Sequence, residues 1–478
     1  MPDPAYPRDL CGYGRTPPPA DWPGRARICV QFVVNYEEGG ENNILHGDAA
    51  SEAFLSDIAG AQPWPGQRHV NIESLYEYGS RAGFWRLWRL FTRRGVPVTV
   101  FGVATALARN PEAVAAMHEA NWEIASHGLK WIDYRDMPEA DEHRHIEAAI
   151  RLHTELTGSR PLGFYQGRTS ANTTRLAMAE GGFLYLADSY ADDLPYWVDG
   201  AAGPQLIVPY TLDANDMRFV TPQGFNSGDQ FFAYLRDSFD TLYEEGADTP
   251  KMLSVGLHCR LAGRPGRVAG LARFLDHVQA HDGVWLARRI DVARRWAHRH
   301  LPADALRPSR LPRALFVELF GDVFEHTPEI AEAAHRAGLS GEHDTAEGLH
   351  RALAAAARAL PHKRQTALIR AHPDLAGRSA RTRQLTPESE REQGSAGLDS
   401  LTEEQETQLT RLNDAYRARF GIPFVMAVKG RRGDDILAAF EARLANAAAA
   451  EHAEALCQIE HIALLRLRDR LPGDGSGA

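Results

Sequence analysis

The spacing of apolar residues changes near residue 300 of this chain. Before that point, short β-branched runs alternate with stretches whose apolar residues recur at helical spacing. After it, Ala- and Leu-rich helical patterns fill the remainder, and no convincing strand is predicted. Between them, Pro302, Pro308 and Pro312 remove backbone N–H groups and discourage a helix from running through. The sequence therefore predicts domains at residues 1–300 and 314–478, joined by a linker at residues 301–313.

The first part predicts alternating strands and helices. Apolar β-rich runs occur at residues 28–34, 98–103, 123–126, 162–165, 184–187, 206–210, 252–257 and 284–286. Helical patterns lie between most of them, at residues 73–93, 111–120, 141–157, 173–180, 230–245 and 267–280. Repeated alternation favours parallel pairing, so we expect an α/β fold, a closed or nearly closed (β/α) barrel.

The second part predicts an all-α bundle. Its helical patterns cover residues 314–324, 328–337, 345–360, 362–370, 403–420, 434–446 and 451–470. An apolar stripe at 3.6-residue spacing indicates a core-facing side, and its members are Leu409, Leu412, Tyr416 and Phe420. In the last helix, Arg466 falls on the same face as Ile459, Ile462 and Ala463. Because Arg is rarely buried without a partner, Arg466 either reaches outward to solvent or faces an anion in a pocket.

Composition narrows the class of protein. A chain of 478 residues exceeds what one core normally serves. The net charge of -10 argues against nucleic acid or an acidic membrane as a partner, since phosphate binding needs concentrated Lys and Arg. The four cysteines lack CxxC spacing, which favours neither a disulfide framework nor a zinc knuckle. Without a leader pattern or an apolar run near the roughly 20 residues of a membrane span, we expect a cytoplasmic protein.

Polar residues stand just after the predicted strands of the first part. They are Glu37, Glu38, His127, Arg168, Asp188 and His258. In a (β/α) barrel the C-terminal strand ends converge, so these side chains can meet in one site. Carboxylates and imidazoles can take a proton from water and return one to a leaving nitrogen, while Arg168 can hold a polar carbonyl group. Hydrolysis is therefore the expected chemistry. The sequence has no GxxxxGK[ST] loop, which argues against phosphoryl transfer, and it has no GxSxG elbow, which would position a nucleophilic serine.

Several motifs of the first part agree in order with one family. They are NYEEGGEN, ASHGLKW, GFYQGRTSANT, DSYADDLPYW and GLHCRLAGRPGR. Residues 6–300 thereby resemble the polysaccharide-deacetylase-like allantoinases, which open the hydantoin ring of allantoin. The parent deacetylases hold a metal through an Asp and two His, but in this chain Glu38 and Trp131 replace the Asp and the second His. Such a set cannot supply the usual three zinc ligands, and the resemblance implies a hydrolase without metal.

From this resemblance, Glu38, His127, Asp188 and His258 are candidates for proton transfer and substrate positioning, and Arg168 for substrate binding. Which of them activates water is left open. The alternative interpretation of this half is a metal-dependent deacetylase acting on an N-acetylated carbohydrate. A non-enzymatic interpretation applies to the whole chain, with barrel and helical bundle serving as a binding scaffold.

Polar motifs of the second part resemble the decarboxylases of 2-oxo-4-hydroxy-4-carboxy-5-ureidoimidazoline (OHCU). The resemblance covers about residues 311–471 and lies in AHPDLAGR, SEREQGSAGL and LNDAYRARFGIPFVMAVKG, with Ile422 in place of the commoner Phe. It implies that His372 and Glu392 carry the decarboxylation. Residues implied in substrate binding are Ser389, Gln393, Asn413, Phe424 and Arg466. No cofactor is expected, because the carbonyl and C=N groups of the ring can accept the electrons that CO2 leaves behind.

The two resemblances fit one reaction sequence. OHCU decarboxylases make (S)-allantoin, which allantoinases hydrolyse to allantoate, so the product of the second domain is the substrate of the first. The sequence therefore predicts a bifunctional enzyme of urate degradation. Its expected partners are small ureides, with neither nucleic acid nor membrane, and we expect a homo-oligomer.

Overall fold

The computed structural model describes residues 7–222, 224–375, 403–429 and 431–473 of the chain. The chain divides into two compact units, Met1–Leu301 and Pro302–Ala478. Within the described residues, no helix is long and apolar enough to cross a membrane. All four cysteines are free.

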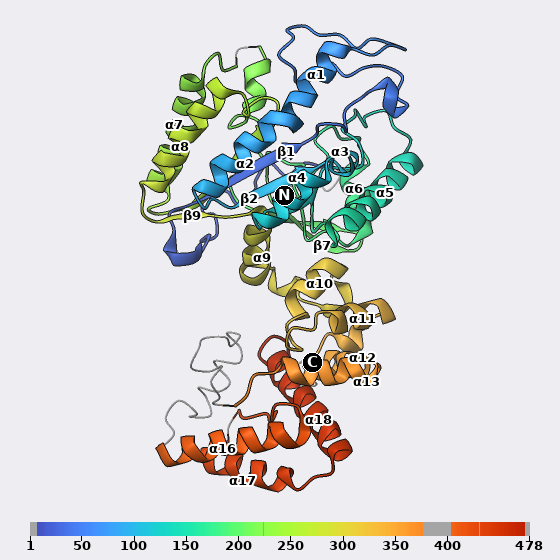
Figure 1. Cartoon of the computed structure of the whole chain (residues 1–478), viewed down its shortest axis with the longest axis vertical. Coiled ribbons are helices and arrows are strands. Elements are labelled where there is room, and N and C mark those ends of the chain that lie inside the picture. Colours follow the sequence, from blue (N-terminus) through green and yellow to red (C-terminus); the bar gives the residue numbers. More distant parts are fainter. Residues whose placement is uncertain (1–6, 223, 376–402, 430, 474–478) are drawn as a thin grey trace. The chain divides into compact units, whose positions relative to one another are not determined.

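The first unit is built on one sheet (Figure 1). Its strands are β1 (Ile28–Tyr36), β2 (Val98–Gly102), β3 (Glu123–Ser126), β4 (Gly163–Phe164), β5 (Tyr185–Leu186), β6 (Tyr196–Gly200), β7 (Gly203–Ile207), β8 (Lys251–His258) and β9 (Val284–Leu286). They follow the order β6-β7-β5-β4-β3-β2-β1-β8, and β9 also pairs with β1. Every pairing is parallel except that of β6 with β7. The predicted α/β barrel fold is confirmed, but as an open half-barrel whose path ends at β6 and β8 among the described strands.

Strand β6 was not predicted from the sequence. It forms an antiparallel pair with β7, and its residues are half-buried or exposed. A strand on the edge of a sheet lacks the continuous apolar run of a buried parallel strand. By contrast, all nine residues of β1 are buried, and their near-continuous apolar pattern predicted the strand correctly.

Helices surround the sheet. They are α1 (Val70–Tyr78), α2 (Phe84–Arg93), α3 (Ala104–Arg109), α4 (Pro111–Glu119), α5 (Glu139–Thr157), α6 (Thr173–Glu180), α7 (Gly228–Glu245), α8 (Pro265–Gln279) and α9 (Arg289–His300). The single helix predicted at residues 73–93 is divided by a π-helical turn at Gly79–Gly83. A Cβ at Gly79 would lie 2.2 Å from Oε1 of Glu38, and one at Gly83 would lie 2.0 Å from the carbonyl oxygen of Cys259. The two glycines therefore let this turn pack directly against the ends of β1 and β8.

The second unit is all-helical in its described residues. Its helices are α10 (Arg313–Phe320), α11 (Glu329–Ala337), α12 (Ala346–Arg358), α13 (His362–Ala371), α16 (Glu403–Phe420), α17 (Gly433–Leu444) and α18 (Ala448–Arg468). The apolar stripe of α16 is core, as predicted, because Leu409, Leu412 and Tyr416 are buried. The predicted bundle is thereby confirmed.

Part of the expected linker packs on the helical unit. The backbone N–H and hydroxyl of Ser309 donate to Asp344 at 2.8 and 2.9 Å, and Leu311 is buried. Residues 309–311 of the expected linker are therefore held by the helical unit. Independent folding of the two halves stays a prediction.

Candidate active sites

A pocket of about 590 Å³ opens at the C-terminal ends of the barrel strands. Of the residues expected there, His127, Arg168 and His258 line it, as does Glu37. The barrel thus brings together side chains that are far apart in the sequence, as the convergence of its strand ends predicts.

The carboxylate of Glu37 lies between the two histidines. Its Oε1 is 3.4 Å from Nε2 of His127 and 3.4 Å from Nε2 of His258, and its Oε2 is 2.7 Å from Nη1 of Arg260. Burial by itself raises the pKa of Glu37, but the charges of Arg260 and His258 outweigh it and hold this pKa well below its usual value. Glu37 is therefore a permanent carboxylate at neutral pH.

His258 is held from its other side by a second carboxylate. Its Nδ1 donates to Oδ1 of Asp216 at 2.6 Å, and Oδ2 of Asp216 accepts the backbone N–H groups of His258 and Ala262. Burial by itself lowers the pKa of His258, but Glu37 and Asp216 outweigh it and raise this pKa to about 9. His258 is therefore an imidazolium at neutral pH, with one N–H aimed at each carboxylate.

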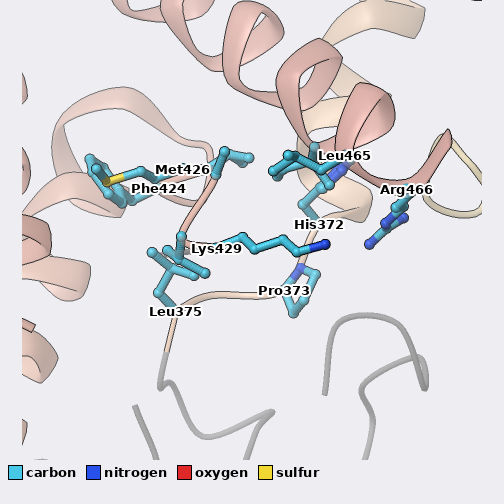
Figure 2. Close-up of a pocket in the computed structure, with 12 residues that line it drawn as sticks. His372, Pro373, Leu375, Phe424, Met426, Lys429, Leu465 and Arg466 are labelled. Carbon is cyan, nitrogen blue, oxygen red and sulfur yellow. The ribbon is translucent and has the colours of Figure 1, made fainter. Parts of the chain in front are cut away.

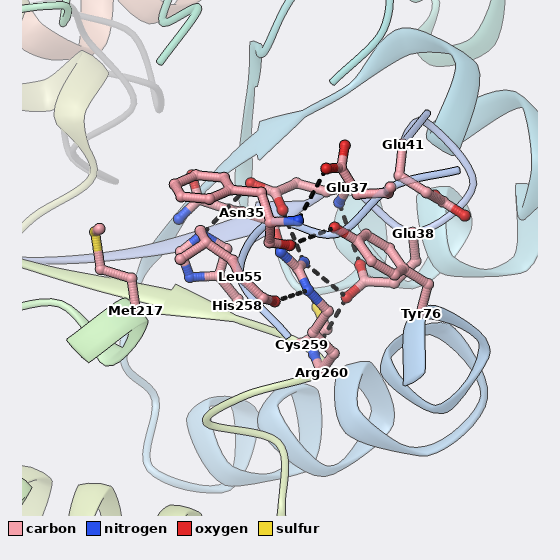
Figure 3. A network of polar contacts seen from close by, with 12 residues as sticks. Asn35, Glu37, Glu38, Glu41, Leu55, Tyr76, Met217, His258, Cys259 and Arg260 are labelled. Atoms are coloured by element: carbon pink, nitrogen blue, oxygen red, sulfur yellow. Dashed lines mark hydrogen bonds and ion pairs between the residues drawn. The ribbon is translucent and has the colours of Figure 1, made fainter. Parts of the chain in front are cut away.

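Glu38 does not occupy the position that the sequence suggested. It does not line the pocket; instead its Oε1 accepts the backbone N–H of Arg260 at 3.2 Å and lies 3.7 Å from Nη1 of the same residue. Figure 3 shows Arg260 beside both carboxylates. Successive residues of an extended chain point to opposite sides, so Glu37 shares the pocket side with Asn35 while Glu38 faces the π-helical turn. Glu37, rather than Glu38, therefore contacts the two histidines, and the catalytic role expected of Glu38 stays a prediction.

Asp188 lies beneath the segment that carries Arg168 rather than in the pocket wall. Its two oxygens accept the backbone N–H groups of Gln166 and Gly167, both at 2.7 Å. Burial raises the pKa of Asp188 to about 6, although these two hydrogen bonds oppose the rise. Asp188 therefore positions the Arg168 segment.

Arg168 is one of two arginines that line the pocket. Its Nη1 lies 3.1 Å from Oε2 of Glu52. The guanidinium carbon also lies 5.2 Å from the ring centroid of Phe54 and 5.0 Å from that of Trp131. An aromatic and carboxylate cradle of this kind fixes the planar fork of donors where a substrate carbonyl can reach it.

The side chains of this pocket do not fit a catalytic metal. Trp131, which replaces the second histidine of the parent motif, packs against Arg168 and Arg260 and offers no ligand atom. Among the described residues lining the pocket, no three His, Cys, Asp or Glu side chains bring their ligand atoms within 4.8 Å of one another. The charge of Arg260 already faces the Glu37 carboxylate. The donor set thus falls short of the three ligands of a usual zinc site.

The helical unit contains a second, smaller pocket of about 40 Å³ (Figure 2). His372, Phe424 and Arg466 line it, as does Lys429, which the sequence pattern did not single out. Nδ1 of His372 lies 3.0 Å from the carbonyl oxygen of Leu368. Because a carbonyl can only accept, Nδ1 carries the proton and Nε2 is the acceptor of the neutral ring. Burial lowers the pKa of His372 to about 4, so the ring is neutral at neutral pH.

Arg466 is buried and faces this pocket, which decides between the two interpretations of its position. Its Nη2 lies 2.8 Å from Oε2 of Glu325, so the burial of its charge is compensated. The Phe424 ring stacks on Phe440 at 3.6 Å. Asn413 does not line the pocket; its side-chain amide donates to the carbonyl of Leu375 at 3.1 Å and supports the segment after His372. The candidates Ser389, Glu392 and Gln393 lie outside the described residues.

Sequence reasoning did not select Asp216, Arg260 or Glu325. Arg260 lies only two residues after His258, so extending the search past the strand end would have found it. Asp216 and Glu325 have no local signal, because only tertiary packing brings each one to its partner.

Fold and pockets together define a chain with two enzyme-like units, an open α/β barrel and a helical bundle. Sequence models of known families match both: polysaccharide deacetylase at residues 69–183 and OHCU decarboxylase at residues 309–468. The chain belongs to the polysaccharide deacetylase family in its first unit and to the OHCU decarboxylase family in its second, which confirms both resemblances at the level of family.

Three relatives illustrate this assignment. A putative polysaccharide deacetylase of Schizosaccharomyces pombe is 43% identical over 61% of this chain and 98% of its own length. A 2-oxo-4-hydroxy-4-carboxy-5-ureidoimidazoline decarboxylase of Haloferax volcanii is 41% identical over 35% of this chain and 95% of its own. The crystal structure of Puue allantoinase is 60% identical, with a TM-score of 0.61, and covers 62% of this chain and 98% of its own.

Proposed function

We propose that this chain is a bifunctional enzyme of urate degradation. Its helical unit decarboxylates OHCU to (S)-allantoin, and its barrel hydrolyses (S)-allantoin to allantoate. The observation that carries the proposal is that near-complete homologues of an allantoinase and of an OHCU decarboxylase are joined in one chain. The product of one reaction is the substrate of the other.

The barrel pocket supports acid–base hydrolysis of a cyclic amide. Water adds to a ring carbonyl carbon, and the bond from that carbon to the ring nitrogen then breaks. His127, held by the Glu37 carboxylate, takes the proton from water. The charge of His258 stabilises the developing oxyanion. Its Nε2–H, which lies 3.4 Å from Glu37 and is held less closely than Nδ1–H, then protonates the leaving nitrogen. Arg168 holds a carbonyl group of the ureide.

Metal-dependent deacetylation of an N-acetylated carbohydrate is the competing function for this half. Its chemistry requires three ligands that converge on one ion. Trp131 and the Arg260–Glu37 ion pair supply no such set, which favours hydrolysis by the chain's own acid and base.

The helical unit supports decarboxylation without a cofactor. The bond between the ring carbon and its carboxylate breaks, CO2 leaves, and the electron pair enters the conjugated ring, which is later protonated on one face. Neutral His372 accepts a hydrogen bond from the hydroxyl on the same carbon through Nε2. Arg466 and Lys429 supply positive charge near the anionic substrate. Glu392 orients the substrate hydroxyl or repels the substrate carboxylate. Ser389 and Gln393 form hydrogen bonds with the substrate ring.

The direct test supplies purified, metal-depleted protein with freshly made OHCU and, separately, with racemic allantoin. Expected results are optically active allantoin from the first substrate and allantoate from one enantiomer of the second. Hydrolysis that is lost on chelation and restored by zinc would contradict the assignment of the barrel. Allantoin formed only at the spontaneous rate and in racemic form would contradict the assignment of the helical unit.

A further inference from the structure

Three metal-ligating side chains meet on the surface of the barrel unit. Asp240 lies on α7, His277 lies on α8, and His281 lies two residues beyond the end of α8. One ligand atom from each lies within 4.8 Å of the other two. Asp240 is exposed and both histidines are half-buried, so an ion can reach all three from solvent. None of them lines the catalytic pocket.

The orientation of the rings is typical of metal-binding histidines. Nδ1 of His281 donates a hydrogen bond to the carbonyl oxygen of His277 at 2.8 Å. Nδ1 therefore carries the proton, and Nε2 of the neutral ring has the lone pair that can bind a metal ion. Such a bond to a backbone carbonyl fixes tautomer and direction in metal-ligating histidines. Nε2 of His277 already lies 2.7 Å from Oδ1 of Asp240. A proton bridges these two atoms in the hydrogen bond, and a metal ion that displaces this proton would use the same two atoms as ligands.

Aromatic packing holds the two rings in place. The Phe239 ring lies 5.5 Å from that of His277 and 5.1 Å from that of His281, and the Tyr243 ring lies 5.1 Å from His281. Phe239 is fully buried in the core, so this wall is rigid. A preorganised pair of imidazoles loses little side-chain entropy on binding an ion.

We propose that Asp240, His277 and His281 form a divalent transition-metal site that ties the end of α8 to α7. Two imidazoles and one carboxylate suit Zn²⁺, Ni²⁺ or Cu²⁺ better than Mg²⁺ or Ca²⁺, which prefer all-oxygen ligands. Tetrahedral zinc with bonds near 2.1 Å needs ligand atoms about 3.5 Å apart. Nε2 of His277 and Oδ1 of Asp240, 2.7 Å apart in their hydrogen bond, must therefore separate to admit the ion. Asp240 is exposed, so its side chain can rotate to make this adjustment, and water takes the fourth position.

This site changes how metal analysis of the protein is interpreted. Any zinc found in the purified protein is assigned by this proposal to the α7–α8 surface, where it takes no part in hydrolysis. The proposal stands apart from the function proposed for the pocket, because metal binding and allantoin turnover are measured separately.

The test is a calorimetric titration of metal-depleted full-length protein with ZnCl2, alongside the double variant His277→Gln/His281→Gln. His143→Gln, which removes an exposed histidine from α5, is the matched control. We expect one zinc equivalent for the parent and control, and at least about 10-fold weaker binding for the double variant. Zinc should raise Tm for the parent and control alone. Bound Co²⁺ should give visible d–d absorption only in those two proteins.

Equal zinc affinity and stoichiometry in parent and double variant would overturn the proposal. Should the double variant fold poorly, Asp240→Asn, which alters one exposed side chain, must show the same weakening; unchanged binding in that variant also counts against the site. Allantoin hydrolysis without zinc should proceed at the parent rate in all variants. Loss of that rate in folded double variant would show that the cluster is not a separate site.

Discussion

Nη1 of Arg260 lies 2.7 Å from Oε2 of Glu37, and both side chains are buried, each with 1% of its surface exposed. The guanidinium also lies 4.2 Å from the ring centroid of Tyr76, so it has no access to water as a substitute partner. Breaking such a pair leaves one charge buried and uncompensated, which typically costs about 3 to 5 kcal/mol. Arg260 is therefore the larger of the two charges that keep Glu37 ionised, and His258 is the other.

Replacing Arg260 by Met should destabilise the barrel by about 3 kcal/mol and lower allantoin hydrolysis by about 10²-fold or more, because Glu37 then takes up a proton. Urea unfolding and kcat measurements check both effects. Arg260→Lys, which keeps the charge, should recover part of the loss. The control is Arg81→Met, which removes an exposed surface pair with Glu77 and should cost at most about 1 kcal/mol. Parent activity in Arg260→Met would contradict the role of the pair.

The pH dependence of hydrolysis should follow His258. Because its pKa is raised to about 9 and the charged form is required, kcat/KM should fall as the pH rises through about 9. Asp216→Asn removes one of the charges that raise this pKa, so the falling limb should move to lower pH. If the falling limb of the pH profile stayed in place in Asp216→Asn, a group other than His258 would be responsible for it.

The raised pKa of His258 also predicts that the stability of the barrel unit depends on pH. A histidine with a raised pKa contributes stability that is fully present below its unfolded pKa, about 6.5, and is lost as the pH rises through about 9. Unfolding free energy should therefore decline between these values more steeply in the parent than in Asp216→Asn. Parallel curves for the two proteins would contradict the coupling.

Arg168→Lys should weaken binding of the ureide. A lysine cannot offer the planar pair of donors, and each charged hydrogen bond lost costs about 1.5 to 3 kcal/mol. The expected fall in kcat/KM is about 10- to 150-fold. Arg135→Lys, which also changes an arginine of the pocket lining, is the control and should have little effect. Unchanged kinetics in Arg168→Lys would rule out the assigned role.

His372→Ala or Glu392→Ala should lower decarboxylation by roughly 10² to 10⁴-fold and leave allantoin hydrolysis unchanged. The measurement is the formation of optically active allantoin from OHCU. His452→Ala, which alters another histidine of the helical unit, is the control. If either variant instead abolished only hydrolysis, the division of reactions between the two units would be wrong.

Fragments 1–300 and 308–478 should each fold and keep their own reaction. The contacts of Ser309 and Leu311 with the helical unit place the second boundary before these residues. Circular dichroism and the two assays check the result. Insoluble or inactive fragments would show that the halves depend on each other.

Local patterns were sufficient for much of the fold. The structure confirms residues 123–126 and 284–286 as strands and residues 173–180 and 403–420 as helices, all at the predicted bounds. These segments follow apolar periodicity and backbone propensity, which act over a few neighbouring residues. The division of the α16 helix into buried and exposed faces followed from the same periodicity.

Sequence by itself also determined which residue types would meet after the barrel strands, since parallel strands carry their C-terminal ends to one edge. It did not determine which of Glu37 and Glu38 faces the histidines, because a difference of one residue reverses the side of the chain. The π-helical turn at Gly79–Gly83 likewise depends on contact with Glu38 and Cys259. Only the tertiary structure brought Asp216 to His258 and Glu325 to Arg466, because pairs separated by 42 and 141 residues meet through packing and leave no periodic signal in the chain.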